Sequence, residues 1–262
     1  MPELVGDKKC LAETCPGPQC RILVHPLFCQ RLTGILDELE VSGGDGHSIY
    51  LTPGASDISR FLPEEEPWKS QAEIVMEQFR ESETGVALFL TQDKIVAIMP
   101  PFPLSVDTLA DDLTTTPLRQ LLDADLLIGV VMLRLGRYGI GVLRGDSLIA
   151  SKTATRHVKN RHRAGGQSQR RFERSRERLV REIYDKACEV AQDVISPHLK
   201  ELDYVMLGGE RHTVNSFVKR CRFLQDLSYK TLNRRVAVDQ PNHKALESIH
   251  REVWKSRVVT FE

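Results

Sequence analysis

The chain has 262 residues, of which 41% are hydrophobic and 27% are charged. These values are ordinary for a soluble globular protein, and the length allows two domains with full cores. Lys plus Arg and Asp plus Glu each number 36, so the net charge points to no particular partner. No run of 18 apolar residues occurs, which excludes a membrane-spanning helix and a membrane partner.

The N-terminus and the cysteines indicate a cytoplasmic protein. The opening sequence MPELVGDKK lacks the apolar core of a signal peptide. Six cysteines are too few for a disulfide scaffold, so we expect reduced thiols. Four of them cluster but lack the C-x2-C spacing of a zinc site, namely Cys10, Cys15, Cys20 and Cys29. The sequence implies no metal and no cofactor.

The first half predicts a small α/β domain of unknown role over residues 21–116. Residues 1–20, punctuated by prolines and a glycine, are expected to form a flexible N-terminus. Pro26 suits the first turn of the first helix. The predicted elements are a helix at 25–40, a strand at 48–53, a helix at 68–82, a hairpin at 85–101 and a connector at 100–116.

The second half predicts a domain over residues 117–262. Three consecutive strands are expected at 126–136, 137–145 and 147–158, with glycines at the turns, which is typical of an antiparallel meander. A long helix, a strand, a helix, a strand and a C-terminal helix follow at 169–195, 203–209, 212–224, 234–240 and 241–254. The fold class is therefore α/β, a mixed sheet with an antiparallel meander and packed helices, preceded by the smaller α/β domain.

The long helix is predicted to be amphipathic. Its expected buried stripe consists of Phe172, Leu179, Ile183, Ala187, Val190 and Val194. Arginines crowd the other side. Between residues 156 and 181 there are ten Lys or Arg residues and two acids, whereas the whole chain is neutral. Such a block favours docking on a polyanion, although a merely solvated helix face gives the same pattern.

A Gly-Gly-Gln tripeptide lies within this basic block, at 165–167. The two glycines lack a Cβ, so the backbone can turn with positive φ and approach another surface closely. The amide of Gln167 can donate and accept hydrogen bonds but is a poor general base. Taken alone, the tripeptide is a weak signal, and for an isolated instance a flexible surface turn is the better explanation.

Its surroundings resemble the middle domain of class-one peptide chain release factors of eukaryotes and archaea. In that family a Lys-Lys-His-Gly-Arg-Gly-Gly-Gln-Ser loop leads into an Arg-Phe-x-Arg-x-Arg helix. Residues 160–168 match the loop and residues 171–176 match the helix, and the loop as a whole spans 161–169. The resemblance covers about residues 120–262 and is specific over 156–191.

The rest of that family's architecture is not evident in the sequence. No Asn-Ile-Lys-Ser codon-reading motif occurs in residues 1–120, and no third domain follows. The chain therefore looks more like the branch of Vms/Ankzf type, which frees nascent chains from tRNA on stalled or split large subunits. In that branch the glutamine often has Gly-x-x-Gln spacing, which Gly166 and Gln169 also satisfy. Gln167 is the preferred working residue, with Gln169 as the alternative.

The resemblance implies hydrolysis of the peptidyl-tRNA ester, with large ribosomal subunit RNA and peptidyl-tRNA as partners. The implied catalytic residues are Gly165, Gly166, Gln167 and Gln169. The implied RNA-binding residues are Arg156, Lys159, Arg161, His162, Arg163, Arg170, Arg171, Arg174 and Arg178. The backbone N–H of Gln167 would stabilise the oxyanion or the leaving 3′-oxygen, and its side chain would orient water.

Two other functions remain open from the sequence. A nuclease that cuts tRNA near its 3′ end would use His157, His162 and nearby arginines. A non-catalytic ribosome-binding module would use the basic helix only as an anchor. The products and the effect of Gln167→Ala distinguish them.

Overall fold

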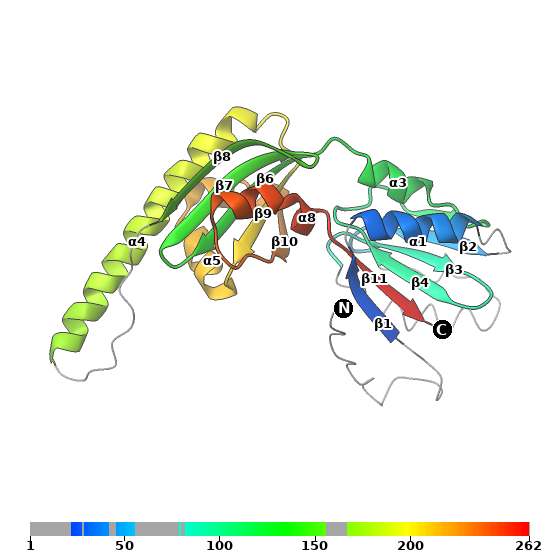
Figure 1. The fold of residues 1–262 in the computed structure, drawn as a ribbon, viewed down its shortest axis with the longest axis horizontal. Helices are drawn as coiled ribbons and strands as arrows, with labels where there is room; N and C mark the ends of the chain where they lie inside the picture. The colour runs from blue at the N-terminus through cyan, green and yellow to red at the C-terminus, as the bar shows by residue number, and fades with distance from the viewer. Residues whose placement is uncertain are drawn as a thin grey trace. The chain divides into compact units, whose positions relative to one another are not determined.

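The structure is a computed structural model that describes residues 22–27, 29–41, 46–55, 79, 82–155 and 167–261. The chain forms two compact units (Figure 1). The first contains Met1–Asp123 together with Trp254–Glu262, and the second contains Ala124–Val253. No helix of the described residues is long and apolar enough to cross a membrane.

The first unit is built on a six-stranded antiparallel sheet of order β1-β11-β4-β3-β2-β5. The strands are β1 (Ile22–Leu27), β2 (His47–Leu51), β3 (Val86–Leu90), β4 (Ile95–Met99), β5 (Thr108–Ala110) and β11 (Ser256–Phe261). Helices α1 (Cys29–Val41) and α3 (Thr116–Leu122) pack on one face through Leu32, Leu36 and Leu118. The central strands are buried on both faces, which explains their continuous apolar sequences.

Three strands of this sheet were not predicted from the sequence: β1, β11 and β5, which lies within the connector expected at 100–116. Residues 22–27 form β1, so Pro26 lies in a strand and not in the first turn of a helix. Among the described strands β1 pairs with β11 alone, so it is an edge strand, where a proline is tolerated. β11 follows the last helix and pairs with β4 and β1, so the chain's last strand completes the first unit.

The second domain was expected to contain all residues from 117 to 262, whereas the last strand belongs to the first unit. The units divide at Asp123 and again at Trp254, whose ring packs edge to face on Phe102 at 4.9 Å. The strand SRVVTF is only six residues long, and its partners lie more than 150 residues earlier in the chain. Local patterning carries no sign of such a distant pairing. Of the helix expected at 68–82, most residues lie outside the described ranges, and Phe79 is helical and buried.

The second unit confirms the expected mixed sheet with an antiparallel meander. Its order is β10-β9-β6-β7-β8, in which β6, β9 and β10 are parallel and β6, β7 and β8 form the meander. The strands are β6 (Leu127–Arg134), β7 (Arg137–Arg144), β8 (Ser147–Thr155), β9 (Tyr204–Gly209) and β10 (Thr231–Val236). β9 ends at Gly209, whose φ is +120°.

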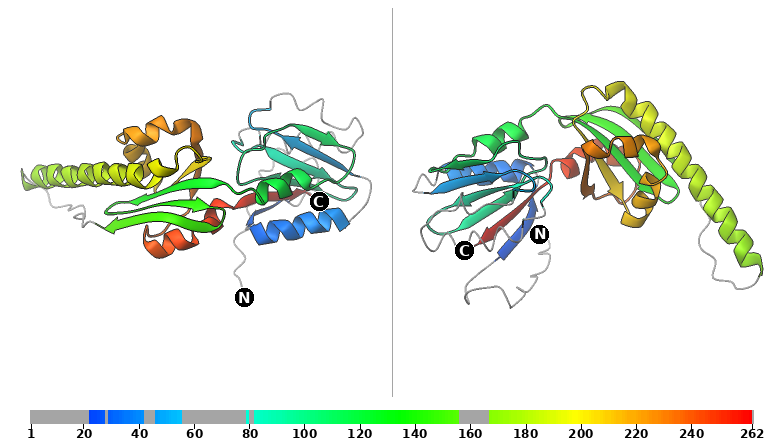
Figure 2. Two further views of the ribbon diagram at one scale, coloured as in Figure 1. Left: turned by 90° about the horizontal axis from the view of Figure 1, so that it is seen from above. Right: turned by 180° about the vertical axis from the view of Figure 1, so that it is seen from behind.

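Helices cover both faces of this sheet (Figure 2). Helices α4 (Gln167–Ile195), α5 (Arg211–Val218) and α6 (Arg222–Asp226) share one core with the sheet, and the short η2 (Ser196–His198) and η3 (Ser228–Lys230) follow α4 and α6. Helix α7 (His243–Ser248) packs on β7, and α8 (His250–Val253) follows it. A Cβ at Gly141 of β7 would lie 3.2 Å from Leu246 of α7, so this glycine lets the helix approach the strand. The single C-terminal helix expected at 241–254 is thus two short helices.

Candidate functional site

The N-terminal half of α4 extends beyond the sheet of its own unit as a free arm (Figure 1). Among the described side chains of the helix Ile183 is the first that is buried, and every described side chain from 171 to 182 is exposed or half-buried. At 1.5 Å per residue, Gln167 lies about 24 Å beyond Ile183 along the helix axis. We call residues 167–182 of α4 the arm.

The burial pattern explains where the helix leaves the sheet. Ile183, Ala187 and Val190 are buried, as expected, whereas Leu179 and Val194 of the predicted stripe are only half-buried. Leu179 lies within the arm, next to Val180, which is the first described residue of the helix that packs against the core. The side chain of Phe172 lies outside the described residues. The amphipathic pattern therefore continues past the point at which the protein's own core ends.

Arginines line the arm. Arg171, Arg174 and Arg178 are exposed, and they recur at i, i+3 and i+7, which places them on one face of the helix. Arg178 lies 3.7 Å from Glu182, and both side chains are solvent-accessible. Within the described part of the chain, no ion pair to an acidic side chain is seen for Arg171 or Arg174. These two guanidinium groups can therefore bind an external anion without first breaking an internal pair.

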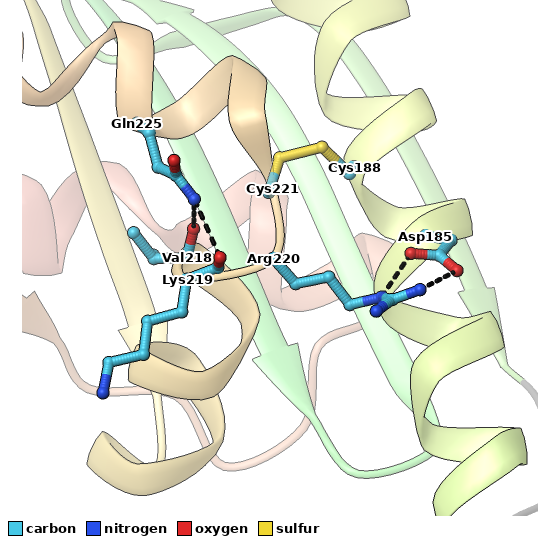
Figure 3. Close-up of a disulfide and its surroundings, with 7 residues drawn as sticks. All are labelled: Asp185, Cys188, Val218, Lys219, Arg220, Cys221 and Gln225. Carbon is cyan, nitrogen blue, oxygen red and sulfur yellow. Dashed lines mark hydrogen bonds and ion pairs between the residues drawn. A yellow bond between two sulfur atoms is a disulfide. The ribbon is translucent and has the colours of Figure 1, made fainter.

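The turn between α5 and α6 fixes α4 just where it emerges from the core (Figure 3). Asp185 accepts hydrogen bonds of 2.5 Å from Arg220 Nε and 2.7 Å from Arg220 Nη2. These hydrogen bonds lower the pKa of the Asp185 carboxyl. The ring of Tyr184 also packs on Phe217 of α5, with ring centres 5.7 Å apart. Together these contacts hold the base of the arm.

A disulfide joins Cys188 of α4 to Cys221 at the same turn. The expectation of reduced thiols is therefore wrong for this pair. The two cysteines are 33 residues apart, and only the packing of α4 against the α5–α6 turn brings them together. Gln225 lies in α6, and its Nε2 donates to the carbonyl oxygens of Val218 and Lys219 at the start of the turn. These hydrogen bonds fix the backbone next to Cys221 (Figure 3).

The remaining predicted site residues are only partly described. Gln167 is the first residue of α4 and Gln169 and Arg170 lie in its first turn, but their side chains are outside the described set. The other predicted residues lie outside the described ranges altogether: Arg156, Lys159, Arg161, His162, Arg163, Gly165 and Gly166. The structure thus places the C-terminal end of the predicted loop at the tip of the arm.

The first turn of α4 has a chemical property of its own. The first four N–H groups of a helix have no partner within the helix, and they carry partial positive charge. Because the helix begins at Gln167, its backbone N–H is one of these groups. The tip of the arm therefore offers hydrogen-bond donors to an oxyanion or a phosphate at the end of a cationic helix. In the described residues, no group of His, Cys, Asp or Glu side chains could hold a metal ion.

Comparison with known proteins assigns the second unit to a family. A family model described as the Actinobacteria/chloroflexi VLRF1 release factor matches residues 127–259, just over half of the chain. The chain belongs to this VLRF1 release-factor family. This membership confirms the resemblance to release factors seen in the sequence. The match spans all of the described second unit except its first residues, and it includes α4 with its arm.

Curated relatives match about half of the chain or somewhat more. The chain is 35% identical over 150 residues to peptide chain release factor subunit 1 of Thermococcus sibiricus, which covers 52% of this chain and 36% of the relative. It is 29% identical over 178 residues to the corresponding subunit of Methanopyrus kandleri, which covers 63% and 43%. The matched region is therefore little more than a third of the length of the first of these relatives.

Solved structures give weaker likenesses. An archaeal translation termination factor, aRF1, matches 87% of this chain and 73% of its own at a TM-score of 0.36 and 19% identity. The Vms1 mitochondrial localization core matches 79% and 89% at a TM-score of 0.41 and 10% identity. The family assignment rests on the sequence matches.

Proposed function

We propose that this VLRF1 family member is a peptidyl-tRNA hydrolase that frees nascent chains from stalled or split ribosomes without reading a codon. The observation that carries the proposal is the arm. An exposed cationic helix segment begins at the glutamine of the Gly-Gly-Gln sequence, about 20 Å before Val180, the first described residue of α4 that packs on the core. This geometry suits a tip that must enter a narrow site inside folded RNA.

The arginines of the arm would bind phosphates of large-subunit RNA and tRNA. Arg171, Arg174 and Arg178 are exposed along one face of the helix. Attraction of this kind depends on counterion release, so binding should weaken steeply as salt rises. The basic residues at 156–163 precede the tip in sequence and would add to the same contact.

The tip would then act on the ester bond. The backbone N–H of Gln167 would donate to the oxyanion or to the leaving 3′-oxygen, and its side chain would orient the attacking water. Donors aimed at developing charge contribute about 10²–10³ in rate each. Gly165 and Gly166 would keep the tip free of side chains. Gln169, two residues further along, is the alternative working glutamine.

The test uses stalled large-subunit complexes that carry a labelled peptidyl-tRNA. The purified chain is added, and one gel separates peptidyl-tRNA, free peptide and tRNA length. Hydrolysis predicts free peptide together with full-length tRNA. Shortened tRNA would instead support a 3′-end nuclease, and no product in the presence of stable binding would support a non-catalytic module. Either of these two results contradicts the proposal.

A further inference from the structure

A second recessed site lies in the same unit, away from the arm. A hollow of about 330 Å³ is lined by residues of α5, α6, η3 and the ends of β9 and β10. Its apolar lining comes from Leu207, Val218, Leu224 and Leu232, of which three are almost fully buried. β10 is an edge strand with an irregular register between Thr231 and Arg235, so one side of the hollow is bounded by a single strand. The volume is at the lower end of the range for small-molecule sites.

The charged side chains of the lining are cationic. Lys219 and Arg235 both line the hollow, and no acidic side chain does so among the described residues. Arg235 Nη2 donates to Asn215 Oδ1 at 2.6 Å. Arg235 Nη1 is shielded from solvent and has no hydrogen-bond partner in the described part of the chain. A buried N–H group without a partner is costly.

Amide and hydroxyl groups complete the lining. Asn215, Ser228 and Asn233 contribute side chains that can both donate and accept hydrogen bonds. Tyr229 follows Ser228 in η3 and exposes 77% of its surface. Tyr229 does not itself line the hollow, and the Nζ atom of Lys230 lies 5.9 Å from the centre of its ring. Exposed aromatic rings beside cationic side chains are typical of surfaces on which nucleic-acid bases stack.

We propose that this hollow binds a nucleoside phosphate. Arg235 and Lys219 would hold the phosphate, because guanidinium and ammonium groups are the usual protein partners of phosphate oxygens. The apolar floor would contact the sugar and base, and the asparagine amides would bind base edges. An acidic peptide would satisfy the two cations but would leave the apolar floor uncovered. The site is independent of the arm, and nucleotide binding there needs no ribosome.

The experiment measures binding of AMP, GMP, CMP and UMP to the full chain by calorimetry. Arg235→Gln and Lys219→Gln should each weaken the affinity about tenfold, because each removes a charge-assisted contact. The matched control is Lys152→Gln, which removes one exposed charge from β8 at the opposite edge of the sheet and should leave the affinity unchanged. Lys219 is exposed, so its variant keeps the test valid even if Arg235→Gln fails to fold.

A six-nucleotide RNA identifies the source of the nucleotide. Tighter binding of the RNA than of any mononucleotide supports one unit of an RNA chain as the ligand, and equal or weaker binding supports a free nucleotide. The proposal is overturned if no nucleotide binds at millimolar concentration or if both variants bind like wild type. It is also overturned if a hexaglutamate peptide binds as tightly as the nucleotides. None of these outcomes bears on ester hydrolysis at the arm.

Discussion

Arg220, at the end of the α5 turn, holds Asp185 of α4 through two parallel hydrogen bonds of 2.5 and 2.7 Å. Asp185 is two residues past Ile183, the first buried residue of the helix. The pair therefore braces α4 close to the point where the helix leaves the core, which is near Val180. The position of the tip depends on how firmly the rest of the helix is held, so contacts far from the reacting atoms affect the chemistry.

Asp185→Asn should destabilise the protein in a pH-dependent way. Arg220 lowers the pKa of Asp185 below its ordinary value of 3.8. A carboxyl with a lowered folded-state pKa stabilises the fold above its unfolded pKa, and that stabilisation is lost as the pH falls through the folded value. The stability difference between wild type and variant should therefore be constant from pH 7 to about pH 5, shrink as the pH falls below the ordinary aspartate pKa, and vanish below the folded-state pKa. Urea unfolding across this range measures it; a difference that persists at low pH would contradict the account.

Removing the disulfide should have a larger effect. In the chain-entropy model, a cross-link between residues 33 apart, such as Cys188–Cys221, stabilises by about 3–4 kcal/mol. The double variant Cys188→Ala/Cys221→Ala should unfold at correspondingly lower denaturant. Reductant should destabilise wild type and leave the double variant unchanged. If reductant leaves the unfolding of wild type unchanged, the disulfide does not stabilise the fold.

Charge on the arm should govern ribosome binding and its salt dependence. Arg174→Gln/Arg178→Gln should weaken binding to the large subunit at low salt and reduce the slope of log affinity against log salt by about one per lost phosphate contact. Sedimentation of the complex at several salt concentrations measures both quantities. Lys200→Gln, an exposed charge after η2, serves as the control and should change neither. An unchanged slope in the double variant would mean that the arm does not contact phosphates.

Gly209 should tolerate no side chain. Its φ is +120°, and a Cβ there would collide with the carbonyl oxygen of Leu133. Gly209→Ala should cost more than about 2 kcal/mol of unfolding free energy. Gly34 of α1 is the contrasting case, because a Cβ there meets no atom within 4 Å. Gly34→Ala should stabilise the protein by about 0.5–1 kcal/mol. Thermal unfolding of the two variants compares them, and a neutral Gly209→Ala would contradict the described backbone.

Local patterns predicted the meander and the long helix because both depend on short-range periodicity. β6, β7 and β8 are consecutive and joined by tight turns, and α4 has an apolar stripe along most of its length. The strands β1 and β11 were missed because each is defined by a partner far away in the chain. Pro26 was especially misleading, since a proline suits both a helix start and an edge strand.

The residue types of the candidate site were predictable from the sequence, but the contacts that hold the arm in place were not. The arginines and the Gly-Gly-Gln sequence can be read from one stretch of the chain. The brace formed by Asp185 and Arg220 and the link between Cys188 and Cys221 depend on tertiary packing, and no local pattern announces them. That the helix projects past the core also follows only from the sheet's position, because an amphipathic stripe does not reveal where its partner surface ends.

The central claim is that the tip of the arm performs the chemistry while the arginines provide the affinity. The most direct measurement is the single-turnover rate of peptide release from stalled large subunits, with binding measured in parallel, for wild type, Gln167→Ala and Gln169→Ala. The account predicts that one glutamine variant, Gln167→Ala in preference, releases peptide about 10²–10³ times more slowly while its binding stays close to that of wild type. Release at the wild-type rate by both variants would contradict it.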